Sequence, residues 1–295
     1  MAAKMPTATL AAAHQLAFSA PPPSRPRRIR LAALAAERLC LSGVRLRQAL
    51  REGGLVLHFQ PILELATGEV RRYEALVRMR GEVAGSLHAP VRFLPGAERS
   101  GLVRELDRAV LRSALLALAE SDVQLAVNLS ALTVCAPGTL SYLEAVLDEH
   151  AVAPERLLIE ITETAAVADF QLARAFCEGA QRLGCAVALD DFGVGFCSLQ
   201  YLTELPFDVI KIDGHFIRDL SRSHRDRVVV KALAQVARAL GKETVAEFVG
   251  DLETIELLRE LGIDHAQGYA VGRPRGTLEG APRRFASGAG GWLID

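Results

Sequence analysis

Short apolar runs alternate with longer amphipathic stretches through most of this chain. The amphipathic stretches, for example 168–183 and 222–240, carry apolar residues at helical spacing. The apolar runs predict strands at 55–60, 70–78, 123–129, 156–161, 185–190, 208–212, 243–247 and 264–268. Strands that alternate with helices run parallel, and eight of them are enough to close a barrel. We therefore predict an α/β fold, a TIM-like (β/α)8 barrel.

The first two predicted strands are an exception to the parallel arrangement. Only a short turn around Ala66-Thr67-Gly68 separates them, and so short a link cannot make a parallel crossover. We therefore expect an antiparallel first strand.

Polar residues stand where the predicted strands end, at positions that an ordinary core strand would fill with apolar residues. They are Asn128, Glu160, Glu163, Asp190, Asp191, Lys211, Asp213, Glu247 and Gln267. A barrel gathers the C-terminal ends of its parallel strands around one pocket, where such folds place their chemistry. The recurrence therefore predicts a polar site at that end of the barrel.

The adjacent carboxylates of Asp190 and Asp191 have two interpretations. Two like charges held together are costly unless a cation or a proton relieves them, which favours a divalent metal site. Asp-Asp after a strand is also common as a helix cap and turn. Glu74 and Arg78 lie on one face of a predicted strand, and their spacing fits an exposed salt bridge as well as a site.

Composition sets limits on partners and compartment. Half of the residues are hydrophobic, 23% are charged and the net charge is −1, so no global charge favours polymeric nucleic acid or an acidic membrane surface. No apolar run approaches the ~18–20 residues of a membrane span. The five cysteines are scattered without a metal-binding pattern, which favours a reducing, cytoplasmic compartment.

The two ends of the chain differ from its middle. Residues 1–40 combine Ala- and Pro-rich sequence with an arginine cluster, typical of a disordered leader or linker. The faint resemblance of the first residues to an export signal is the alternative. We expect the barrel to occupy 41–278 and residues 279–295, which lack a clear pattern, to form a C-terminal tail.

Ordered motifs between about Leu46 and Arg275 resemble those of EAL-domain cyclic di-GMP phosphodiesterases. They are FQPI (59–62), EALVR (74–78), VNLS, EITE, DDFG, LPFDVIKID, VAEF and QGY. So many motifs in this order are far more specific than any one of them. The resemblance implies a barrel with an antiparallel first strand, in agreement with the hydrophobic pattern.

The resemblance also implies roles for individual residues. It implies one divalent cation held by Glu74, Asn128, Glu160 and Asp190, and a second held by Asp190, Asp191 and Glu247. Lys211 would join Asp190, Asp191 and Glu247 in catalysis, and Glu163 would support the loop after Asp191. Contacts to substrate would come from Gln60, Arg78, Asp213 and Gln267.

The implied reaction is hydrolysis of one phosphodiester of cyclic di-GMP to linear 5′-pGpG. Oxygen-only ligands suit Mg²⁺ or Mn²⁺, and a pair of such cations would activate water and stabilise phosphoryl oxygens. A cyclic di-GMP receptor that binds without turnover, and signals through a protein partner, is the alternative. The family resemblance further implies a homodimer.

The sequence departs from the family pattern at two loops. The usual DDFG(T/A)GYSS has Val194, Phe196 and Cys197 at three of its positions, so hydroxyls that could fix the loop are missing. The usual AEGVE is AEFVG here, with Phe248 for the glycine and Gly250 for the second carboxylate. These changes favour the receptor, whereas the intact set of implied metal ligands favours the enzyme.

Overall fold

The structure is a computed structural model that describes residues 43–162, 169–193 and 199–278, and the backbone of 283–284, 286–288 and 291–293. It contains two compact units. One comprises the described residues up to Val56 together with Val77–Val110, and the other comprises Leu57–Leu76 and the described residues from Leu111 onward. Among all described residues, no helix has both the length and the apolar character needed to cross a membrane.

The larger unit is built on a closed barrel. Its strands are β1 (Leu55–Glu64), β2 (Glu69–Arg80), β4 (Gln124–Leu129), β5 (Leu157–Thr162), β6 (Ala186–Phe192), β7 (Val209–Ile212), β8 (Glu243–Ala246) and β9 (His265–Gln267). Neighbours pair in the order β1-β9-β8-β7-β6-β5-β4-β2, and a β1–β2 pairing closes the ring. Strands β2 and β4–β9 are parallel to one another, whereas β1 runs antiparallel to β9. The predicted TIM-like barrel with an antiparallel first strand is confirmed.

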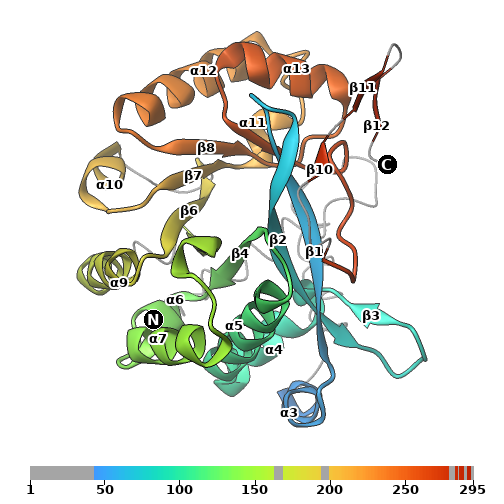
Figure 1. Cartoon of the computed structure of the whole chain (residues 1–295), viewed down its shortest axis with the longest axis vertical. Coiled ribbons are helices and arrows are strands. Elements are labelled where there is room, and N and C mark those ends of the chain that lie inside the picture. Colours follow the sequence, from blue (N-terminus) through green and yellow to red (C-terminus); the bar gives the residue numbers. More distant parts are fainter. Residues whose placement is uncertain are drawn as a thin grey trace, which may run out of the picture. The chain divides into compact units, whose positions relative to one another are not determined.

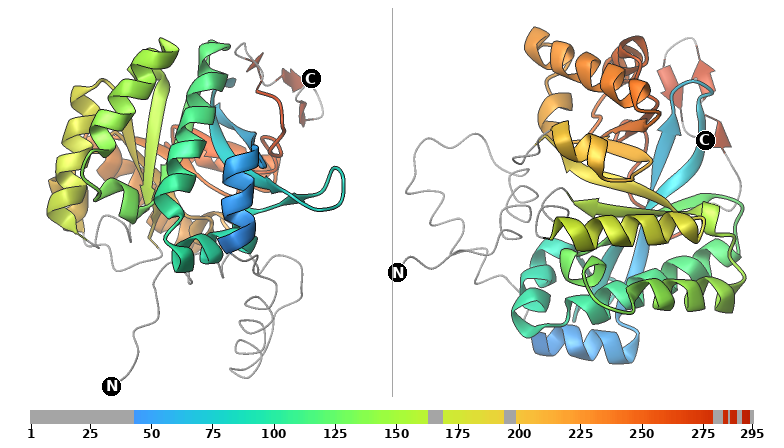
Figure 2. Two further views of the ribbon diagram at one scale, coloured as in Figure 1. Left: turned by 90° about the horizontal axis from the view of Figure 1, so that it is seen from below. Right: turned by 90° about the vertical axis from the view of Figure 1, so that its left-hand side faces the viewer.

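Helices cover the outside of the barrel between successive strands (Figures 1 and 2). The helices described in this unit are α5 (Val103–Ala119, of which residues 111–119 belong to this unit), α6 (Ala131–Val134), α7 (Thr139–His150), α9 (Phe170–Arg182), α10 (Leu199–Glu204), α11 (Gly214–Ile217), α12 (His224–Ala239) and α13 (Leu252–Leu261), with a 3-10 turn at Pro154–Arg156. The side chains of Asp169, Ser223 and Asp251 cap α9, α12 and α13 by accepting backbone N–H bonds. Such capping residues satisfy amides that would otherwise lack partners and fix where each helix begins.

The smaller unit contains α3 (Gly43–Glu52), β3 (Leu87–His88) and α4 (Pro90–Ser100), with the adjoining ends of β1, β2 and α5. Helix α3 packs against α4, where Gly43 lies so close to Ser100 that a larger residue would clash. Helix α4 ends at Ser100 and is capped by Gly101, whose φ of 69° suits glycine.

Several short elements were not predicted from the sequence, including β3, α6 and α11. The C-terminal tail, residues 279–295, has no clear pattern in its sequence. It nevertheless contributes three short strands, β10 (Arg283–Arg284), β11 (Ala286–Gly288) and β12 (Gly291–Leu293). Strand β10 pairs with the start of β2, and β11 pairs with β12. Elements of two to four residues have too little periodicity to be recognised from sequence.

The barrel interior is layered because side chains alternate along each strand. A central apolar layer is formed by Ile62, Ala126, Leu158, Ala188, Val209 and Val245. The residues two positions later on five of these strands are Asn128, Glu160, Asp190, Lys211 and Glu247. The apolar layer therefore forms the floor beneath a polar layer at the C-terminal ends of the strands.

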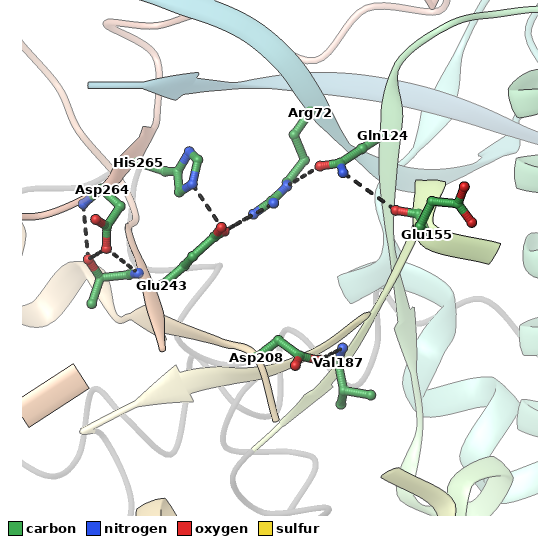
Figure 3. A network of polar contacts seen from close by, with 9 residues as sticks. Arg72, Gln124, Glu155, Val187, Asp208, Glu243, Asp264 and His265 are labelled. Carbon is green, nitrogen blue, oxygen red and sulfur yellow. Dashed lines mark hydrogen bonds and ion pairs between the residues drawn. The ribbon is translucent and has the colours of Figure 1, made fainter. Parts of the chain in front are cut away.

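A second polar layer lies at the N-terminal ends of the strands (Figure 3). Arg72 donates to Gln124 at 3.1 Å and, through both terminal nitrogens, to one oxygen of Glu243 at 3.1 Å. His265 lies 3.2 Å from the same Glu243 oxygen. The bond to His265, together with the charge of Arg72 and against the effect of burial, lowers the pKa of Glu243 to about 2. This network lies at the end of the barrel opposite the polar layer that contains Lys211.

Glu243→Gln should reduce stability, because it removes the charge that Arg72 and His265 contact. The side chain is 51% exposed, so solvent screening should limit the loss to about 0.5–1 kcal/mol. Its lowered pKa means that the contribution is present above about pH 4.5 and disappears as the pH falls toward 2. Urea unfolding across this pH range measures the difference.

The matched control is Glu256→Gln, which removes the same charge from the exposed helical pair with Arg259. It should change the free energy of unfolding less and without the same pH dependence. Equal losses in both variants would show that the layer has no special role in stability.

Candidate active site

The polar layer at the C-terminal ends of the strands centres on the ammonium of Lys211. Its Nζ lies 2.9 Å from Glu160, 3.0 Å from Asp190 and 2.9 Å from Glu247, with Glu74 at 3.8 Å. Lys211 is 1% exposed, and β7 fixes its backbone between β6 and β8. The fold therefore brings four of the carboxylates predicted from sequence around one buried cation.

Burial works against the charge on Lys211, but the attraction of Asp190, Glu160, Glu247 and Glu74 is larger and raises its pKa well above the ordinary value. The carboxylates respond in the opposite way. Burial is the main cause that raises the pKa values of Glu160, Asp190 and Glu247, and Lys211 only partly offsets it. One ammonium is thus too little positive charge for this cluster.

Asp191 joins the cluster through an irregularity in β6. The two aspartates were expected where the strand ends, but β6 continues to Phe192 and its register with β7 shifts between Leu189 and Phe192. Asp191 has a φ of 56°, which disrupts the strict alternation of side chains. One oxygen from each of Asp190, Asp191 and Glu247 lies within 4.8 Å of the others. Burial, followed by the charge of Asp190, raises the pKa of Asp191 to about 7.

Amide side chains complete the ring of polar groups. Asn128 donates its Nδ2–H groups to Glu74 at 2.7 Å and to Glu160 at 3.0 Å. Gln267 donates to Glu74 at 2.5 Å and lies 3.4 Å from the amide oxygen of Gln60. Gln60 also donates to the carbonyl of Gly272, in the segment after β9, at 3.2 Å.

The remaining predicted site residues differ in their placement. Asp213 is buried and caps α11, where its side chain accepts the N–H of His215 at 2.7 Å. Its charge is also among the causes that raise the pKa of Asp191. Arg78 belongs to the smaller unit, where it donates to the carbonyl of Val77 at 2.9 Å, so its predicted role at the site stays a prediction.

Other predictions fall on positions that the structure does not describe. They concern Glu163, Val194, Phe196, Cys197 and residues 1–40.

The described groups fit divalent cations by charge and by donor type. Glu160 Oε1 is buried and has no hydrogen-bond partner among the described residues, and Asp190 Oδ1 has only its ion-pair contact with Lys211. Five carboxylates and one ammonium leave a formal charge of −4 when all are ionised, which two divalent cations would balance. Carboxylate oxygens are also the ligands that hard cations prefer. Asn128 could join them only if its amide turned to present oxygen.

The residue after Glu247 is unusual in its backbone. Phe248 has a φ of 56°, a conformation that costs a non-glycine residue about 1–2 kcal/mol. It is 43% exposed, and the guanidinium of Arg218 lies over its ring at 4.4 Å from the centroid. Phe248 departs from the family pattern in the sequence, but the residues that it contacts are seen only in the structure.

Comparison with known proteins identifies the family from the whole span of the barrel. Residues 44–274 match the EAL domain. This chain belongs to the EAL domain family. Glu74, Ala75 and Leu76, which give the domain its name, lie on β2, and Glu74 points into the carboxylate cluster.

Two curated relatives are much longer than this chain. The chain is 40% identical to the cyclic di-GMP phosphodiesterase PdeB of Shewanella oneidensis over 79% of its own length and 28% of PdeB. It is 38% identical to the cyclic di-GMP phosphodiesterase NbdA of Pseudomonas aeruginosa over 78% of its length and 30% of NbdA. The chain thus spans less than a third of the length of these relatives.

Two solved EAL structures share the fold over most of the chain. A complex of the PaMucR phosphodiesterase with c-di-GMP is 35% identical with a TM-score of 0.73, covering 78% of this chain and 95% of that one. The FimX EAL domain from Pseudomonas aeruginosa bound to c-di-GMP is 29% identical with a TM-score of 0.76, covering 81% and 98%.

Asp191→Asn should stabilise the metal-free protein, because it removes a buried charge that its neighbours repel. With a pKa raised from 3.8 to about 7, Asp191 contributes stability below about pH 4 that is lost as the pH rises through 7. At pH 7.5 in EDTA, we expect the variant to gain roughly 1–2 kcal/mol in the free energy of unfolding by urea.

Asp219→Asn, an exposed aspartate near α11, is the control for loss of one charge and should change stability little. A destabilised Asp191→Asn, or an equal gain in the control, would contradict the strain assigned to this cluster.

Proposed function

We propose that this EAL domain is a metal-dependent phosphodiesterase that hydrolyses cyclic di-GMP to linear 5′-pGpG. The observation that carries the proposal is the ring of carboxylates around Lys211 at the C-terminal end of the barrel. Relatives named as cyclic di-GMP phosphodiesterases, at 38–40% identity, support the substrate and the reaction class.

Two divalent cations, Mg²⁺ or Mn²⁺, fit the donor set. Glu74, Asn128, Glu160 and Asp190 would hold one, and Asp190, Asp191 and Glu247 the other. When bound, such cations supply positive charge that activates water and stabilises phosphoryl oxygens. The cluster of Asp190, Asp191 and Glu247 supports the second position, because their oxygens already lie within 4.8 Å of one another.

Lys211 is the protein's own cation in this reaction. Its ammonium is held by three carboxylates within 3.0 Å, so it is oriented before substrate arrives. A preorganised cation in a buried site can stabilise negative charge that develops on a phosphate in the transition state. Its raised pKa keeps it protonated at neutral pH and therefore makes it a poor general base.

The polar side chains around the cluster would orient the substrate. Gln60 and Gln267 offer amide groups beside Glu74, and Asp213 lies at the start of α11. Arg78 supplies a planar guanidinium that matches a phosphate, as the family resemblance implies. A homodimer and a cytoplasmic location, both expected from the sequence, stay predictions.

Purified protein with Mn²⁺ or Mg²⁺ should convert cyclic di-GMP to 5′-pGpG, and Ca²⁺ should support little turnover because of its larger and looser coordination. Glu74→Ala and Asp190→Ala should each lower the rate by at least about 100-fold, because each removes a proposed metal ligand. Chromatography of the nucleotides measures the product. The control is Glu64→Ala, which changes a carboxylate at the turn of the β1–β2 hairpin, outside the proposed site.

Binding of cyclic di-GMP without product in the presence of Mn²⁺ would establish the receptor alternative, which the changes at Phe248 and Gly250 favour. Absence of both binding and product would refute both functions.

Lys211→Met should lower kcat by about 100-fold or more and change KM little, if the ammonium acts mainly on charge that develops in the transition state. Methionine retains the length of the buried side chain, and unfolding measurements would separate loss of charge from loss of fold. An increase in KM with unchanged kcat would instead assign Lys211 to ground-state binding.

A further inference from the structure

The segments that follow β6, β7 and β8 are joined by backbone hydrogen bonds. The N–H of Asp213 donates to the carbonyl of Phe192 at 3.3 Å, and the N–H of Glu247 donates to that of Ile212 at 3.1 Å. These bonds therefore couple the positions of the three segments, which carry Asp191, Lys211 and Glu247. Helix α11 begins in the middle one, directly after Asp213.

Helix α11 contacts the segment on the Asp191 side through an aromatic ring. Gly193, two residues after Asp191, lies against Phe216 of α11, and a Cβ on this glycine would lie 3.2 Å from Phe216 Cζ with a still closer approach to Cε2. Gly193 also has a φ of 103°, which disfavours any side chain. The ring of Phe216 thus limits where the backbone after Asp191 can lie.

A matching contact stands on the Glu247 side. Phe248 packs on Gly214, the first residue of α11, where a Cβ would lie 2.7 Å from Phe248 Cγ. Arg218, just after α11, covers the ring of Phe248. Because the backbone of Phe248 is in a conformation that glycine adopts more easily, these ring contacts must offset the strain.

We propose that α11, with the pairs Phe216–Gly193 and Phe248–Gly214, is a positioning bracket that sets the spacing of Asp191 and Glu247 for the second cation. The proposal rests on the proposed metal-dependent function. Phe248 stands where the family pattern has glycine, and its ring packs on Gly214, a contact that a glycine could not make. Phe216 and Phe248 are positioning residues, since they act through Asp191 and Glu247.

The bracket predicts a specific effect of Phe248→Gly. Glycine relaxes the backbone, so the melting temperature in EDTA should stay within about 2 °C of wild type or rise. Without the ring, Glu247 is held less firmly. Of the two proposed Mn²⁺ sites, the one that binds more weakly should therefore lose about 10-fold in affinity. Isothermal titration of the full chain with Mn²⁺ alone, without nucleotide, measures this directly.

Three variants complete the experiment. Phe248→Tyr keeps the ring and should bind Mn²⁺ as wild type does, and Phe216→Leu should weaken the same site from the other side of α11. Leu116→Ala removes an exposed apolar side chain from α5 and is the control, with no expected change in Mn²⁺ binding. In turnover assays, excess Mn²⁺ should restore the rate of Phe248→Gly, while KM for cyclic di-GMP stays unchanged.

Wild-type Mn²⁺ isotherms for both Phe248→Gly and Phe216→Leu would overturn the bracket and leave the proposed function intact. Wild-type protein that binds no Mn²⁺ would overturn the proposed function, and the bracket with it. If Phe248→Gly fails to fold, Phe216→Leu alone decides between these outcomes.

Discussion

The buried ammonium of Lys211 and the carboxylates around it form the interaction on which the rest of the site depends. Glu160, Asp190 and Glu247 come from three different strands and would repel one another in a dry interior without a cation between them. One ammonium relieves only part of that repulsion, as the raised carboxylate pKa values show. The same imbalance that strains the protein supports the proposed binding of divalent cations. Stability and the proposed function therefore oppose one another at this end of the barrel.

The barrel makes this arrangement possible by separating three layers. The apolar floor of Ala126, Val245 and their neighbours keeps water away from the underside of the carboxylate cluster. At the opposite end, Arg72 and Glu243 form a polar network that is balanced in charge and hydrogen-bonded. Strands β2 and β9 contribute to both ends with side chains two positions apart, Arg72 and Glu74 on one and His265 and Gln267 on the other. The balanced end can stabilise the fold, whereas the unbalanced end is available for chemistry.

Local strain is concentrated where function is proposed. Two of the non-glycine residues with positive φ are Asp191, near the end of β6, and Phe248, just after β8. The carboxylates of these two segments would share a cation. Phe216 of α11 contacts Gly193, two residues after Asp191, and Phe248 itself packs on Gly214, the first residue of α11. Strained backbone persists only where surrounding contacts hold it in place. The short helix α11 provides such contacts in both segments.

Pattern in the sequence was enough to predict the strand–helix alternation, the antiparallel first strand and the strand-end polar residues, because these depend on local periodicity, link length and the side-chain alternation within a strand. It also identified the family, through many motifs in order. It could not show that Asp191 enters the site through a register shift within β6, or that Asn128 turns its nitrogen toward Glu74 and Glu160. Nor could it pair Phe216 with Gly193, or Phe248 with Gly214. Those facts depend on contacts between segments far apart in the chain, and only the closed barrel brings these segments together.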